Sequence, residues 1–155
     1  MRAGAVLFPA SPTLTIARPH RYGNANVWRY FTDLFDYLPL AASVQDQVLV
    51  VHGGLSSQAM TLDQIRIIDR FQEVPEEGPV TDMLWGEPDI NNLGFHKAAR
   101  GGGLNFGADA VQHFLQANNL KHMVRSHTLC VEGYHVAFGG RCVPRLCCLS
   151  GCFSF

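Results

Sequence analysis

Two histidines and one arginine stand in sequence contexts that can support chemistry. His52 follows the apolar, β-branched run Val48–Val51 and precedes two glycines, and His127 closes a short apolar stretch that starts at Met123. Arg100 stands directly before three consecutive glycines. A buried strand fixes the place of its last residue, and glycines let the backbone turn sharply beside a ligand. These three residues are therefore the candidate site residues.

The chemistry that suits them is metal-assisted hydrolysis of a phosphate ester. Imidazoles at two strand ends can hold a divalent ion, and a guanidinium beside free backbone N–H groups suits a phosphate oxyanion. The ion would lower the pKa of bound water and stabilise charge on the phosphoryl oxygens. A purely structural role for His52 and His127 stays open at this point. The other five histidines have no such context and are expected to be structural or solvent-exposed: His20, His96, His113, His122 and His135.

The elements that must position these residues alternate between helix and strand. Apolar residues at three- and four-residue spacing predict a core-facing helix from Asn24 or Asn26 to about Leu38. A turn near Asp46 leads into the strand that ends before His52, and Thr61 is a plausible cap for a helix over residues 62–70.

The second half of the chain is less regular. Residues 71–107 carry little periodicity apart from residues 80–85, and such a long stretch in a compact domain is uncommon unless it is functional or disordered. A helix over residues 108–118 is expected to bury Val111, Phe114 and Leu115, followed by the strand before His127. Residues 133–138 predict a last hairpin or strand.

Length, charge and cysteine usage bound the class of protein. The chain has 155 residues, 47% of them hydrophobic, which suits one domain with a core. The formal net charge of -1 gives no reason to expect nucleic acid or an anionic membrane as a partner, and no run of about 18 apolar residues predicts a membrane span. The distribution of the five cysteines, four of them within residues 142–152, does not resemble a disulfide framework. A four-cysteine zinc site there is disfavoured because no Cys-x-x-Cys pair is present.

The amino-terminal segment has a distinct composition. Residues 1–32 contain four arginines and no acidic residue, as in an organellar transit peptide, but three prolines break the amphipathic helix that such a peptide needs. We expect an unstructured or non-native leader over residues 1–21 and a cytoplasmic, or also nuclear, protein.

A series of ordered motifs closely resembles the phosphoprotein phosphatase family, specifically the 2A-like catalytic subunits. The resemblance runs from Tyr22 to about Phe138. It is carried by seven motifs: Tyr22-Gly23-Asn24-Ala25-Asn26-Val27-Trp28, Phe35-Asp36-Tyr37-Leu38, His52-Gly53-Gly54-Leu55-Ser56, Thr61-Leu62-Asp63-Gln64-Ile65-Arg66, Gln72-Glu73-Val74-Pro75, Asp82-Met83-Leu84-Trp85 and Glu132-Gly133-Tyr134.

The resemblance implies an α/β calcineurin-like metallophosphatase fold, a β-sandwich flanked by helices, here with its N-terminal half missing. It implies a serine/threonine protein phosphatase with two divalent ions, manganese or iron and zinc. His52 and His127 match histidine ligands of the second ion, and Arg100 matches a phosphate-binding arginine. Phosphoprotein substrates and scaffold or regulatory subunits are the implied partners.

Departures from the family pattern limit what this chain is expected to do. The motifs Gly-Asp-x-His-Gly, Gly-Asp-x-Val-Asp-Arg-Gly and Gly-Asn-His-Glu, which supply the other metal ligands, are not in the sequence. Thr128 stands in place of Gln, and Gly86-Glu87 in place of Ser-Asp. We therefore expect a partial catalytic domain over residues 22–138 and a divergent Cys-rich tail over residues 139–155. This chain alone is expected to hold at most one metal ion weakly and to show no turnover. The alternative is a non-catalytic module that binds scaffold or regulatory subunits.

Overall fold

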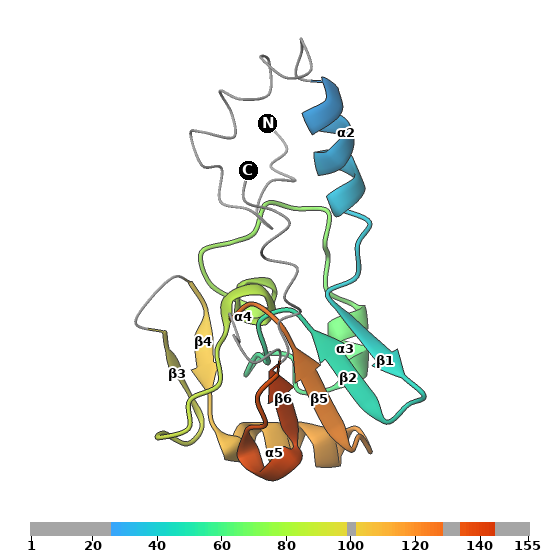
Figure 1. The fold of residues 1–155 in the computed structure, drawn as a ribbon. Coiled ribbons are helices and arrows are strands. Elements are labelled where there is room, and N and C mark those ends of the chain that lie inside the picture. The colour runs from blue at the N-terminus through green and yellow to red at the C-terminus, as the bar shows by residue number, and fades with distance from the viewer. Residues whose placement is uncertain (1–25, 99–101, 129–133, 145–155) are drawn as a thin grey trace. The chain divides into compact units, whose positions relative to one another are not determined.

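The structure is a computed structural model that describes residues 26–98, 102–128 and 134–144 (Figure 1). These residues belong to two compact units. The first contains residues 26–39 and 69–75, and the second contains residues 40–68, 76–98, 102–128 and 134–144. Arg100, Cys130, the leader over residues 1–21 and most of the Cys-rich tail lie outside the described residues.

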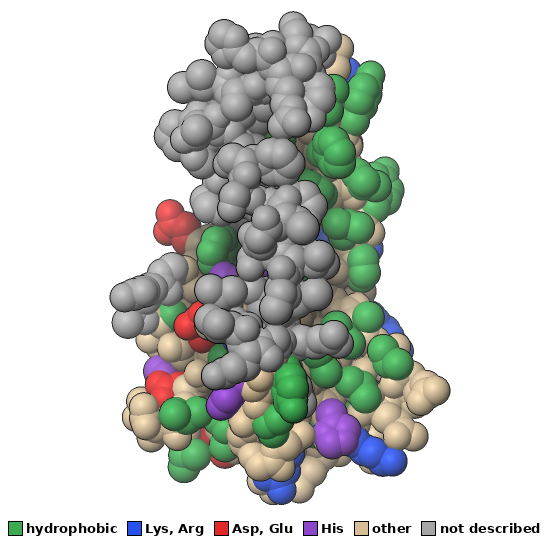
Figure 2. Space-filling view, viewed as in Figure 1, with side chains coloured by type: hydrophobic (Ala, Val, Ile, Leu, Met, Phe, Trp, Pro, Cys, Tyr) green, Lys and Arg blue, Asp and Glu red, His purple; other side chains and the backbone are tan. Residues whose placement is uncertain are grey.

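The first unit is built on helix α2, Asn26–Phe35. The helix was predicted, but the prediction that its apolar face is buried in a core was wrong. Thr32 is its one buried residue. Three of its large apolar side chains are exposed, as are hydrophobic side chains over α2 in Figure 2: Tyr30 by 64%, Phe31 by 53% and Leu34 by 53%. Periodic apolar residues determine that a helix has an apolar face, but they do not determine what covers that face.

The chain beyond α2 is held to residues 69–75 of the same unit. Arg70 Nη1 donates to the carbonyl oxygens of Tyr37 (3.2 Å) and Leu38 (2.7 Å). The rings of Tyr37 and Phe71 meet edge to face, with centroids 5.2 Å apart. Helix α2 ends at Phe35, earlier than the predicted end at about Leu38. The contacts of Arg70 and Phe71 hold the turn that follows it.

The second unit contains a mixed four-stranded sheet in the order β1-β2-β5-β6. Its strands are β1 Ala41–Val44, β2 Val48–Val51, β5 His122–Arg125 and β6 Cys142–Pro144. β1 pairs antiparallel with β2, whereas β2 with β5 and β5 with β6 are parallel. Left-handed backbone at Gln45 (φ 52°) and Asp46 (φ 51°) makes the predicted turn between β1 and β2.

A second, two-stranded sheet pairs β3 Phe95–Lys97 with β4 Leu104–Phe106. This sheet lies within residues 71–107, where the sequence shows periodicity only over residues 80–85. Helix α4, Pro79–Trp85, forms over that periodic segment. The prediction of an irregular stretch was therefore wrong for β3 and β4. Three residues are too few for alternation of apolar and polar side chains to be visible in a sequence.

Two further helices pack in this unit. Helix α3, Leu62–Arg66, begins at the predicted cap: Gln64 N–H donates to Thr61 Oγ1, and Gln64 Oε1 accepts from the Thr61 N–H. It ends four residues earlier than expected. Helix α5, Ala108–Ala117, follows the prediction and ends at Asn118. No helix among the described residues is long and apolar enough to cross a membrane.

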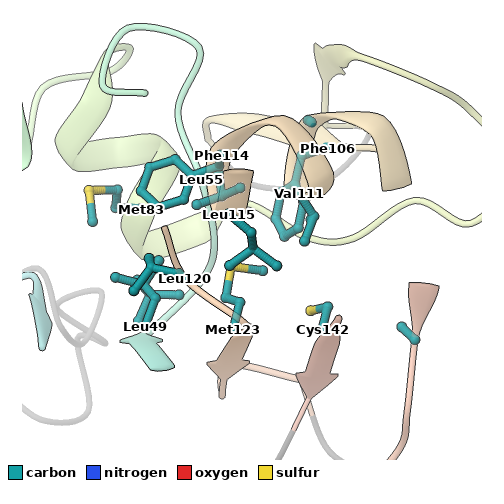
Figure 3. Packing of buried hydrophobic residues seen from close by; sticks show 13 residues of the cluster. Leu49, Leu55, Met83, Phe106, Val111, Phe114, Leu115, Leu120, Met123 and Cys142 are labelled. Carbon is teal, nitrogen blue, oxygen red and sulfur yellow. The ribbon is translucent and has the colours of Figure 1, made fainter. Parts of the chain in front are cut away.

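The core lies between one face of the four-stranded sheet and helices α4 and α5 (Figure 3). Leu49 and Val51 of β2 and Met123 of β5 point into it, while Val50 on the opposite sheet face is 37% exposed. Val111, Phe114 and Leu115 of α5 are buried there, as predicted. The expected α/β class is confirmed.

The last described residues extend this sheet. Of the hairpin or strand predicted over residues 133–138, the described part from residue 134 takes the hairpin form, in which a 3₁₀ turn over Phe138–Gly140 leads into β6. Ala137 forms a bridge with Cys142, as in a tight hairpin. Cys142, in the segment assigned to the divergent tail, is a fully buried core residue.

Replacing a core residue of α5 tests this packing. Phe114 is fully buried, so we expect Phe114→Ala to lower the free energy of unfolding by about 3–5 kcal/mol. The control is His113→Ala, at the neighbouring exposed position, which should change it by no more than about 0.5 kcal/mol. Urea denaturation followed by circular dichroism measures both, and equal midpoints would contradict the assigned core.

Candidate metal site at the ends of two parallel strands

His52 lies directly beyond the last residue of β2, and the backbone after it is held by α4. The N–H groups of Gly53 and Gly54 both donate to the carbonyl oxygen of Met83, at 2.7 and 3.2 Å. Both glycines are buried, and a Cβ on Gly54 would lie within 3 Å of the Phe106 ring. The pair of glycines therefore allows the close approach that the sequence suggested.

His127 reaches the same place from β5. Because β2 and β5 are parallel with Val51 opposite Arg125, the residues after them leave the sheet at the same edge. Ser126 N–H donates to the carbonyl oxygen of His52 at 3.0 Å, which continues the pairing by one step. The ring centroids of His52 and His127 lie 5.0 Å apart with their planes at 59°. The structure thus brings the two predicted histidines together.

The hydrogen bond of His52 selects its tautomer. Nδ1 lies 2.8 Å from the carbonyl oxygen of Leu84, which can only accept, so Nδ1 carries the proton. In the neutral tautomer with this proton on Nδ1, the lone pair is on Nε2. A metal-bound histidine commonly donates its other ring N–H to a backbone carbonyl in this way, which fixes the orientation of the ring.

His127 is set in an environment that favours the neutral ring. Burial lowers its pKa, and the neighbouring His52 and Arg125 lower it further. The edge of the Trp85 ring system meets the imidazole at 89°, with centroids 5.4 Å apart. Its backbone has a φ of 71°, which a residue with a Cβ seldom adopts. A neutral imidazole held in an unusual backbone conformation is consistent with a ligand position.

The two imidazoles fit part of a metal-ligand set. A divalent ion in a protein takes at least four ligands. Within residues 26–98, 102–128 and 134–144, no three histidine, cysteine, aspartate or glutamate side chains lie close enough together to hold an ion. As metal ligands, His52 and His127 would make two of a larger set.

Arg100 lies outside the described residues, so its predicted role in phosphate binding stays a prediction. The strands on either side of it are closed by a hydrogen bond from the Ala98 N–H to the Gly103 carbonyl oxygen, at 3.2 Å. His96 of β3 contacts Asp89 through Nε2 and Oδ2 at 2.8 Å. This pair joins β3 to the loop that follows α4.

Sequence reasoning missed a buried polar pair between the loop after His52 and helix α4. Ser56 Oγ donates to Asp82 Oδ2 at 2.5 Å, and both residues are 1% exposed. Burial raises the pKa of Asp82, and the hydrogen bonds from Ser56 and the Leu104 backbone oppose that rise. Both residues lie in motifs that carry the family resemblance, which was the available signal, but nothing in their spacing showed that they meet.

Gly53→Ala tests how the Leu84 carbonyl is placed. A Cβ at Gly53 would lie 2.6 Å from the Leu84 carbonyl carbon and 2.7 Å from its oxygen, so that backbone must move. We expect about 1–3 kcal/mol loss of unfolding free energy, from urea denaturation, and a second tautomer of His52 in ¹⁵N NMR. Ser57→Ala, at an exposed position nearby, is the control. An unchanged His52 spectrum would show that Leu84 does not set the tautomer.

Asp89 makes stability depend on acid pH. Hydrogen bonds from the Asn92 side chain and the Asn91 N–H, with His96 adding to them, lower its pKa from 3.8 to about 2. The ionised Asp89 therefore contributes fully to the free energy of unfolding above about pH 4, and this contribution is lost as the pH falls toward 2. We expect Asp89→Asn to reduce the slope of unfolding free energy against pH between these values. A slope equal to that of the wild type in urea denaturation would disprove this.

Comparison with known proteins identifies the family. Residues 15–131 match the model of the calcineurin-like phosphoesterases. The chain is 47% identical over 121 residues to a protein phosphatase 2A catalytic subunit of Dictyostelium discoideum, a match that covers 78% of this chain and 39% of that protein. It is 50% identical over 118 residues to a putative serine/threonine-protein phosphatase of Schizosaccharomyces pombe, a match that covers 76% of this chain and 38% of that protein.

A solved structure agrees with these relatives. The Saccharomyces cerevisiae serine/threonine phosphatase described as similar to human phosphatase PP5 superposes with a TM-score of 0.75 at 32% identity. The match covers 83% of this chain and 40% of that one. The chain thus spans about two fifths of the length of the proteins that it matches. The resemblance found in the motifs is confirmed, and the chain belongs to the calcineurin-like phosphoesterase family.

Proposed function

We propose that this chain carries part of the active site of a metal-dependent protein serine/threonine phosphatase, which hydrolyses phosphoserine and phosphothreonine. The observation that carries the proposal is the pair of imidazoles at the ends of β2 and β5, 5.0 Å apart. Metal-assisted hydrolysis needs ligands fixed before the substrate arrives, and adjacent parallel strands provide that rigidity. The relatives, which are named as phosphatases, support the same reaction class.

Each candidate residue has a separate task in this proposal. His52 binds the ion through Nε2, because Nδ1 is engaged with the Leu84 carbonyl. His127 binds beside it as a neutral ring, with Trp85 against its edge. Arg100 pairs with oxygens of the substrate phosphate, which its planar fork matches. An ion held by these imidazoles would lower the pKa of a bound water and stabilise negative charge on the phosphoryl oxygens.

The chain alone is proposed to bind an ion weakly and to lack turnover. Two histidines leave at least two coordination positions to other groups, and three motifs that would supply ligands in the resembling family are not in the sequence. The identity of the ion, manganese or iron and zinc, rests on that resemblance. The proposed substrates are phosphoproteins, and the proposed partners are scaffold or regulatory subunits in the cytoplasm or nucleus.

Metal titration and an activity assay test this proposal together. Isothermal titration of the purified chain with Mn²⁺ should show one weak site, and His52→Ala should weaken it at least tenfold because it removes a ligand. His113→Ala, at an exposed position on α5, should leave the affinity unchanged. An aryl phosphate with Mn²⁺ should not be hydrolysed above background.

Two results would contradict the proposal in different ways. Hydrolysis that disappears in His52→Ala would overturn the inactivity of the isolated chain while supporting the site. An equal Mn²⁺ affinity in the wild type and His52→Ala would show that His52 is not a ligand of the ion.

A further inference from the structure

Arg125 is a buried cation beside the candidate site. It is the last residue of β5, its exposed fraction is 2%, and it is the largest fully buried side chain among the described residues. A charge in the core is costly unless hydrogen bonds satisfy its donors. The partners of Arg125 therefore decide what this guanidinium does.

Its three nitrogens reach three separate segments of the chain. Nε donates to the Gly53 carbonyl oxygen at 2.5 Å, and Nη2 donates to the Gly86 carbonyl oxygen at 3.3 Å. Nη1 donates to Thr128 Oγ1 at 2.9 Å. Gly53 adjoins His52, Gly86 adjoins Trp85, and Thr128 adjoins His127, so each partner is next to a residue of the site.

A carboxylate completes this arrangement through the threonine. Thr128 Oγ1 accepts from Arg125 and donates its own proton to Glu87 Oε1 at 2.9 Å. Charge-assisted hydrogen bonds of this kind are stronger than neutral ones. The chain of contacts from Arg125 through Thr128 to Glu87 thus ties the His127 segment to the loop after α4.

We infer that Arg125 is a positioning residue of the site, whose fork holds the segments of His52, Trp85 and His127 so that the two imidazoles face one ion. The inference rests on the proposed function. Lysine cannot take over this role, because its single ammonium lacks the planar fork that reaches three directions at once. Thr128 and Glu87 complete the support from the His127 side.

The first experiment uses the metal-free full chain, so it does not depend on turnover. Long-range ¹H–¹⁵N NMR of the imidazoles reports the tautomer and surroundings of His52 and His127. We expect Arg125→Lys and Thr128→Val to shift the His127 signals, and Arg125→Lys also to introduce a second tautomer of His52. Thr128→Ser, which keeps the hydroxyl, and Arg141→Lys, at an exposed position, should retain the wild-type spectrum.

The second experiment titrates the same variants with Co²⁺ and follows its visible absorption. Loss of groups that orient metal ligands typically weakens metal binding by about 10- to 100-fold, so we expect this range for Arg125→Lys and a smaller loss for Thr128→Val. Thr128→Ser should restore the affinity. If Arg125→Lys does not fold, Thr128→Val with its serine rescue decides, because Thr128 is exposed.

The outcomes separate the inference from the proposed function. Imidazole signals that stay unchanged in folded Arg125→Lys and Thr128→Val, with only a lower thermal midpoint, would show that Arg125 is merely structural and would overturn the inference. Absence of Co²⁺ binding in the wild type would overturn the metal site instead, while the NMR spectra would still show whether Arg125 orients the two rings.

Discussion

The parallel pairing of β2 with β5 is the constraint on which the rest of the site depends. These strands are far apart in the sequence, and the register that sets Val51 opposite Arg125 is what places their following residues at one sheet edge. A slip of one residue would turn Leu49 and Met123 out of the core, so burial of that face fixes the register. The geometry of the two histidines is thus a by-product of core packing.

The sequence alone predicted the parts of the site that follow from strong local patterns. β2 and the His52 that follows it were predicted because a β-branched run leads into a histidine and two glycines. α5 was predicted because Val111, Phe114 and Leu115 recur at helical spacing. The shorter strands β3 and β4 were not predicted, since three residues show no pattern. β1 was missed because Ala41–Val44 has only one β-branched residue.

Contacts between distant backbone groups were beyond sequence reasoning. Nothing in the spacing of His52 and Leu84 indicates that the Leu84 carbonyl oxygen accepts a hydrogen bond from the His52 ring. Arg125 lies two residues before His127 in the sequence, yet its burial and its three partners depend on how separate loops meet at the sheet edge. The helix α2 shows the converse limit, because its periodicity was correct while its expected burial was not.

The contact between Thr128 and Glu87 has a consequence for how such sequences can change. Both positions depart from the family pattern, and their side chains share one hydrogen bond next to a buried cation. Replacing either residue alone already removes this hydrogen bond, so the effects of the two changes should not add. These two positions are therefore expected to vary together among related chains, as an evolutionary record of a contact that neither position reveals by itself.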